Sequence, residues 1–139
     1  MRRVGTFEDL IAWQKARHLA GRVYAMTRTP KFSADWSLAR QMQRAAVSVV
    51  SNIAEGHERG GSKDFARFLL MAKGSSAELR AQAYLASDVG LLADGEVQEL
   101  LRLATEVGRL IGGLCRSVLA RVPPPIGPGE ASSAGARSS

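Results

Sequence analysis

Residues 37–79, SLARQMQRAAVSVVSNIAEGHERGGSKDFARFLLMAKGSSAEL, decide the fold, because a Gly-rich turn there separates two helical patterns. At 100° per residue, the apolar side chains before the turn share one face of a helix. They are Leu38, Met42, Ala45, Ala46, Val49 and Ile53. A second apolar face follows the turn, formed by Phe65, Phe68, Leu69, Ala72, Ser76, Leu79, Ala83 and Ala86. The stretch therefore predicts two long amphipathic helices.

A row of polar side chains runs along one edge of the first of these faces. Its members are Gln41, Arg44, Ser48, Asn52 and Glu55. A buried polar group without a partner costs about 1–3 kcal/mol, so such a row needs hydrogen bonds. We expect a structural polar network between helices here; a binding site is the alternative interpretation.

Two further helices flank the central pair. Residues 7–28 form the first, which Pro30 ends, and residues 29–35 are expected to be a connection. The second helix is expected to end near Glu55, with Gly56 as its left-handed terminal residue.

The third helix covers about residues 63–89, with Ser62 as its N-cap and a notch of small residues at 74–76 that indicates close approach of another backbone. The fourth begins at Asp94 and ends before Pro123. Short links between four amphipathic helices predict an all-α, antiparallel up-down-up-down four-helix bundle.

Composition supports one helical domain. Of 139 residues, 45% are hydrophobic and only 6% aromatic. We expect the bundle to occupy residues 1–121 and the Pro/Gly/Ser/Ala-rich segment 122–139 to be a disordered tail. No apolar run approaches the roughly 18 residues that cross a bilayer, so the sequence predicts a cytoplasmic protein without a membrane partner. The one cysteine, Cys115, is expected to be a buried thiol.

The charge balance favours acidic partners. The net charge is +6, and Arg supplies 15 of the 19 basic residues. Nucleic acid is the usual partner of such proteins, because each neutralised phosphate releases counterions. The candidate contacts are Arg59, Lys63, Arg67 and Lys73. A merely solvated turn is the alternative for this region.

Some apolar residues lie away from the expected core. They are Val47 and Val50 on the second helix, and Leu70, Ala77, Ala81 and Tyr84 on the third. Because contiguous apolar patches usually mark interfaces, these positions predict self-association.

Catalytic and metal-binding patterns are lacking. The turn at residues 56–63 places Ser before Lys and follows a helix, so it does not match a phosphate-binding loop. The chain has two histidines, and neither the spacing of Glu55 and His57 nor the position of His18 fits a di-metal carboxylate site. We therefore predict no enzymatic activity and no metal or other cofactor.

Four motifs together carry a family resemblance. They are FEDL-x-AWQKA at residues 7–16, Y-x-MTR at 24–28, L-x-x-Q-x-x-RAA-x-SV-x-SNIAEG at 38–56 and F-x-x-FL-x-x-A-x-GS-x-x-EL at 65–79. Over about residues 6–120 the chain resembles the four-helix bundle proteins encoded by intervening sequences of bacterial 23S rRNA genes. It is also similar to the accessory protein of diversity-generating retroelements.

The resemblance implies a ring of identical subunits, typically a homopentamer, without known catalytic activity. The retroelement protein is a basic pentamer thought to bind nucleic acid and a reverse transcriptase. The similarity to it supplies the nucleic-acid hypothesis for this chain, with a reverse transcriptase or another protein as a further candidate partner, whereas the retroelement role itself is not carried over. The chain departs from the family pattern at Ala77, where a larger apolar residue is common, and at Arg80, where an acidic residue is common.

Two functional hypotheses follow. The first is a non-enzymatic, homo-oligomeric bundle that binds RNA or DNA through a basic surface, without strong sequence preference. The second is a protein-protein interaction scaffold in which positive charge only aids solubility.

Overall fold

The computed structural model describes residues 5–124 and contains helices without strands in that part of the chain. A short 3-10 turn, η1 (Phe7–Asp9), precedes α1 (Ile11–Thr27) and the four-residue helix α2 (Pro30–Ser33). Three long helices follow: α3 (Trp36–Arg59), α4 (Ser62–Asp88) and α5 (Asp94–Leu119). The all-α prediction is confirmed. The predicted tail lies outside the described residues from position 125 onward.

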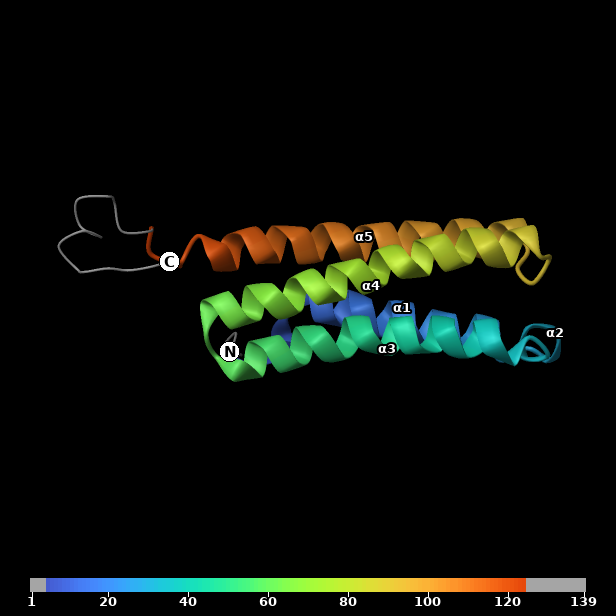
Figure 1. Ribbon diagram of the computed structural model, residues 1–139, viewed down its shortest axis with the longest axis horizontal. Coiled ribbons are helices and arrows are strands. Elements are labelled where there is room, and N and C mark those ends of the chain that lie inside the picture. The colour runs from blue at the N-terminus through green and yellow to red at the C-terminus, as the bar shows by residue number, and fades with distance from the viewer. Residues whose placement is uncertain (1–4, 125–139) are drawn as a thin grey trace, which may run out of the picture.

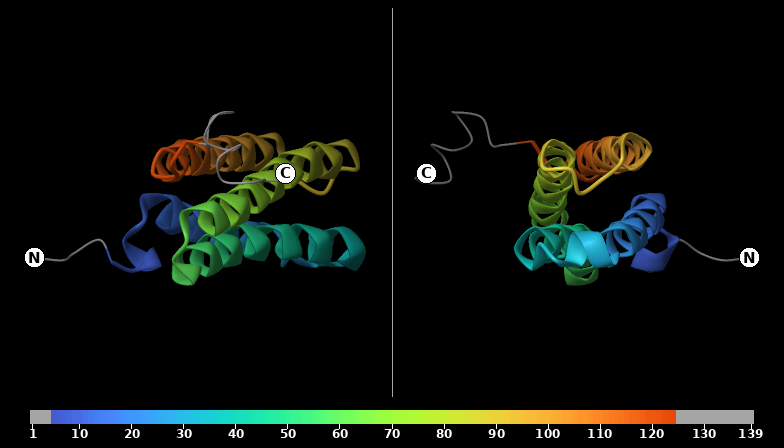
Figure 2. Two further views of the ribbon diagram at one scale, coloured as in Figure 1. Left: turned by 60° about the vertical axis from the view of Figure 1, so that its left-hand side comes forward. Right: turned by 90° about the vertical axis from the view of Figure 1, so that its right-hand side faces the viewer.

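Each long helix packs against two others, in the order α1, α3, α4, α5 and back to α1. Figure 1 shows the α3–α4 turn at one end of the molecule and the α4–α5 turn at the other. In Figure 2, α4 runs obliquely from beside α3 at its start to beside α5 at its end. This path makes α4 the helix through which the α3 and α5 layers are joined.

The core lies between these four helices. Its largest fully buried side chains come from every long helix and from α2: Leu19, Val23, Phe32, Met42, Val49, Ile53, Leu69, Leu79, Leu100, Val107, Ile111 and Val118. Cys115 is buried, as predicted, and its thiol lies 3.8 Å from the carbonyl oxygen of Ala66. The predicted apolar faces of α3 and α4 are therefore the faces that pack.

The expected connection at 29–35 contains a helix instead. Thr29 accepts a hydrogen bond from the amide of Phe32 at 3.2 Å, and Pro30 occupies the first turn. Both features start a helix. Asp35 then caps α3 by accepting from the amide of Leu38 at 3.2 Å. The short helix places Phe32 in the core, where its side chain is 0% exposed.

The expected end of the second helix at Gly56 was wrong. The helix α3 continues to Arg59, and Gly60 takes the left-handed conformation with φ 87°. Gly56 is needed for a different reason. A Cβ atom at that position would lie 2.6 Å from the Cβ atom of Phe68 on α4. The glycine therefore permits close packing of α3 on α4.

The three small residues at 74–76 lie in different surroundings. A Cβ atom on Gly74 would meet nothing within 4 Å, so Gly74 itself does not face a packed backbone in the described chain. Ser75 instead bonds to α3, and Ser76 is buried against α5. The close approach predicted from this notch is therefore made at Ser76, opposite Gly108.

Candidate nucleic-acid interface

The arginines at the turn between α3 and α4 form ion pairs with acidic side chains of the same turn. Arg59 donates to one carboxylate oxygen of Asp64, and Arg67 donates to the other at 3.0 Å. A guanidinium nitrogen of Arg59 also lies 3.8 Å from Glu55. Both guanidiniums lie over the ring of Phe68, at 5.2 Å for Arg59 and 4.6 Å for Arg67. The hydrogen bonds from Arg59 and then Arg67 lower the pKa of Asp64 below its ordinary value.

The four predicted nucleic-acid contacts therefore do not form one site. Arg59 and Arg67 are engaged within the chain, and Lys63 is exposed beside the same turn. Lys73 lies ten residues further along α4, which is about 15 Å of helix. It faces α5 and belongs to a different surface.

That surface is a groove between α4 and α5 with a volume of about 310 Å³. We call it the α4–α5 groove; its lining residues are Lys73, Ser76, Ala77, Arg80, Thr105, Gly108, Arg109, Gly112 and Arg116. Four of these carry positive charge, and none is acidic. A Cβ atom on Gly108 would lie 3.1 Å from the hydroxyl oxygen of Ser76, so the helices approach closely at the floor.

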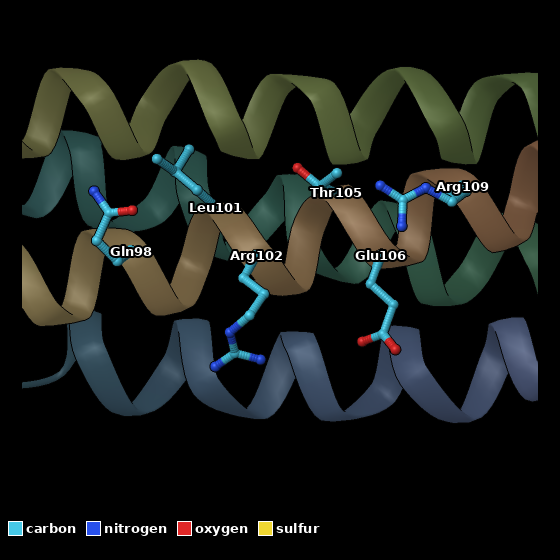
Figure 3. A pocket seen from close by; sticks show the side chains of 6 residues that line it. All are labelled: Gln98, Leu101, Arg102, Thr105, Glu106 and Arg109. Carbon is cyan, nitrogen blue, oxygen red and sulfur yellow. The ribbon is translucent and has the colours of Figure 1, made fainter.

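The acidic side chains in the middle of α5 face the other neighbouring helix. Glu99 bonds to Arg22 of α1, and Glu106 lies 3.6 Å from Lys15 of α1. Figure 3 shows Glu106 on the α1 side of α5, whereas Arg109 lies on the α4 side. Glu99 and Glu106 are thus matched with cations of α1, and the α4 side of α5 keeps an uncompensated positive charge.

Sequence reasoning missed most of this groove. Arg80, Arg109 and Arg116 were not among the predicted contacts, although Lys73 was. The sequence does hold one signal for the groove: its two cations on α4 are seven residues apart, about two helical turns, and so are its two cations on α5. Periodicity places each pair on one face of its own helix, but it does not say which two faces meet.

Arg22 and Glu99 form a two-pronged contact between α1 and α5. Arg22 Nε donates to Glu99 Oε2 at 2.7 Å, and Nη2 donates to Oε1 at 3.1 Å. The side chains keep 37% and 28% of their surface exposed. The hydrogen bonds from Arg22 lower the pKa of Glu99 below its ordinary value. A two-pronged ion pair of this kind is stronger than an ordinary surface ion pair, although solvent still screens it.

Replacing Glu99 with Gln should lower the free energy of unfolding by about 1 kcal/mol near neutral pH, because Arg22 loses its charged partner. A lowered folded-state pKa means that the pair stabilises the fold above the ordinary carboxylate pKa and loses this contribution as the pH falls through the folded value. Urea unfolding of both proteins should therefore give a difference that shrinks below about pH 4. A difference that stays constant down to pH 3 would contradict the assignment.

The predicted polar row is only partly a network. The hydroxyls of Ser48 and Ser75 lie 2.8 Å apart between α3 and α4, and Asn52 Nδ2 donates to the hydroxyl and the carbonyl oxygen of Ser48, both at 2.9 Å. Gln41 and Arg44 are exposed and line a hollow of about 450 Å³. The fifth member, Glu55, is exposed beside Arg59.

The predicted interface positions lie mostly at the surface. On α4, Leu70 and Tyr84 are each 59% exposed, and Ala77 and Ala81 between them are exposed as well. We call these four residues the α4 stripe. On α3, Val47 is exposed, whereas Val50 is half-buried and packs against the core.

The described residues hold no group of three His, Cys, Asp or Glu side chains placed to bind a metal ion. His57 is half-buried and packs edge-on against Phe65, with ring centroids 5.6 Å apart, while the exposed Glu55 lies beside Arg59. Over the same part of the chain, no helix is both long and apolar enough to cross a membrane.

Comparison with known proteins identifies relatives of this fold. A solved structure of a protein of unknown function from the S23 ribosomal protein family of Bacteroides thetaiotaomicron is 17% identical, with a TM-score of 0.67. The match covers 76% of this chain and 99% of that one, and it shows similarity of fold. No curated protein matches the chain. The profile described as 23S rRNA-intervening sequence protein matches residues 8–113, so the chain belongs to this family.

Proposed function

We propose that this protein is a non-enzymatic, homo-oligomeric helical bundle of the cytoplasm that binds RNA or DNA through a basic surface. The observation that carries the proposal is the α4–α5 groove, whose lining contains four cations and no acidic side chain. Phosphate groups suit such a surface, because Arg and Lys bind them by charge-assisted hydrogen bonds.

The proposed architecture is an antiparallel up-down-up-down bundle of α1, α3, α4 and α5. Support comes from the closed order of helix contacts and from the short links after α3 and α4. Short links place consecutive helices side by side in opposite directions. Such a bundle leaves the outer faces of α4 and α5 free for partners.

Self-association is proposed through the α4 stripe, with Val47 and Val50 of α3 as further contacts. Exposed Leu70 and Tyr84 favour such a contact, because burying an apolar side chain contributes about 1.5–3 kcal/mol. The family resemblance points to a pentamer. Five copies at +6 each would carry about +30, and multivalent contact would strengthen the binding of a polyanion.

Titration of labelled RNA at two salt concentrations tests the nucleic-acid proposal. Affinity should be measurable at about 50 mM salt and fall steeply by about 200 mM, because each neutralised phosphate releases counterions. Binding that is absent at low salt, or that is unchanged by salt, would reject the proposal. Sedimentation of the same samples should show an assembly at micromolar protein.

An interaction scaffold is the second candidate, and the exposed α4 stripe is the observation that favours it. A ring could present such a surface to another protein, for example a reverse transcriptase, while its charge aids solubility. A pull-down after nuclease treatment separates the two functions. A protein partner that stays bound without nucleic acid supports the scaffold, whereas a partner lost on nuclease treatment supports nucleic-acid binding.

A further inference from the structure

The geometry points to a single strand of RNA or DNA as the ligand of the α4–α5 groove, held by its phosphodiester backbone. This inference rests on the proposed function and assigns the site, the strand state and the mode of recognition. The predicted basic turn at Arg59 and Arg67 is the competing location, but its charges are compensated by Asp64 and Glu55.

The cations of the groove form one row. Ser76 lies opposite Gly108, and the Nζ atom of Lys73 lies 3.6 Å from the position of a Cβ atom on Gly112. Residue numbers thus rise along α4 as they fall along α5. At 1.5 Å per residue, this register spreads the Cα positions of the four cations over about 18 Å. Their order is Arg116, Lys73, Arg109 and Arg80. The charged ends of Lys73 and Arg116 lie close together, each 3.6 Å from the position of a Cβ atom on Gly112.

One row of cations matches one backbone. A duplex carries its phosphates on two strands that wind around one axis, and in B-form DNA these strands are separated by grooves about 6 and 12 Å wide. A single strand can instead follow the row, with successive phosphates meeting side chains from alternate helices. The glycines Gly108 and Gly112 line the groove between the cations, so they leave room for a backbone to approach.

The lining also indicates how the strand is read. The groove residues include no aromatic ring on which a base could stack and no Asn or Gln to pair with a base edge. Contacts to phosphate position a ligand without reading its sequence. The groove should therefore accept RNA and DNA strands of differing sequence with similar affinity.

Fluorescence anisotropy with the full chain tests the assignment. The probes are a labelled uridine oligonucleotide of about 16 nucleotides and an RNA duplex of equal length. The groove variant carries Arg80→Ala and Arg109→Ala. The control carries Lys31→Ala and Arg40→Ala, which remove the same charge from exposed positions on α2 and α3. Circular dichroism checks that both variants keep their helices.

The wild type should bind the single strand at least tenfold more tightly than the duplex. The groove variant should bind the single strand about tenfold more weakly at low salt, and its slope of log affinity against log salt should be shallower by about 1.4. The control should keep most of the affinity and slope. Restoring both positions as Lys should recover the slope, since charge rather than shape sets it.

The outcomes separate this inference from the proposed function. If the wild type binds neither probe, both fall. If the wild type binds but the groove variant equals the control, or the duplex binds as tightly as the single strand, the groove assignment is wrong and nucleic-acid binding stands.

Discussion

Replacement of Phe32 by Ala is expected to lower the free energy of unfolding by about 3–5 kcal/mol, the cost of deleting a large buried aromatic side chain. Phe32 is 0% exposed, although it lies on a helix of only four residues. The Thr29 cap and the Pro30 first turn fix that helix. The segment cannot readily collapse into the space that the ring leaves, so the cavity should persist.

Trp36→Ala is the matched control for Phe32. Trp36 lies four residues after Phe32, at the start of α3, and is larger, but it is 65% exposed. Its replacement should change the free energy of unfolding by about 0.5 kcal/mol or less. Urea unfolding followed by circular dichroism measures both. Equal losses in the two variants would show that Phe32 does not seal the core.

Gly56→Ala should lower the free energy of unfolding by about 2 kcal/mol, although alanine is the better helix former. The added Cβ atom would lie 2.6 Å from the Cβ atom of Phe68 and 3.1 Å from the ring of Phe65. The Phe68 Cβ atom is fixed to its backbone, so α3 and α4 must separate. Loss of tight packing at this turn should outweigh the gain in helix propensity.

Gly21→Ala is the control, because it should change the free energy of unfolding in the opposite direction from Gly56→Ala. Gly21 lies inside α1, and a Cβ atom there would meet nothing within 4 Å. This substitution should raise the free energy of unfolding by about 0.5–1 kcal/mol through helix propensity alone. The same chemical change thus stabilises at one glycine and destabilises at the other. Two stabilising results would contradict the close packing of α3 on α4.

Periodicity predicted the packing faces well, because a helix repeats its side chains every 3.6 residues regardless of partner. Every residue assigned to the buried faces of α3 and α4 is buried. Helix ends were harder to predict. Gly56 matched a terminal glycine in sequence, but Gly60, four residues later, takes that role. Pro30 alone predicts the end of a helix, whereas Thr29 before it caps a new helix that Pro30 begins.

The candidate groove could not be predicted from local pattern. Lys73 and Arg80 come from one helix and Arg109 and Arg116 from another, so their meeting depends on helix register. The charges of the α3–α4 turn pose the converse problem. The i,i+3 spacing of Asp64 and Arg67 on α4 already allows that pair to form, whereas only the fold shows that Arg59 reaches Asp64 across the turn. Side-chain pairing across a turn or an interface is a tertiary property.

The sole sulfhydryl of the chain, at Cys115, gives the protein a built-in reporter. Its sulfur lies 3.8 Å from the carbonyl oxygen of Ala66, where the first turns of α4 meet the last turns of α5, and the residue is only 6% exposed. A thiol reagent should therefore react with it mainly when those segments separate. The rate of alkylation of Cys115 therefore reports how often the start of α4 and the end of α5 separate, close to the α4–α5 groove, and the measurement needs no attached dye.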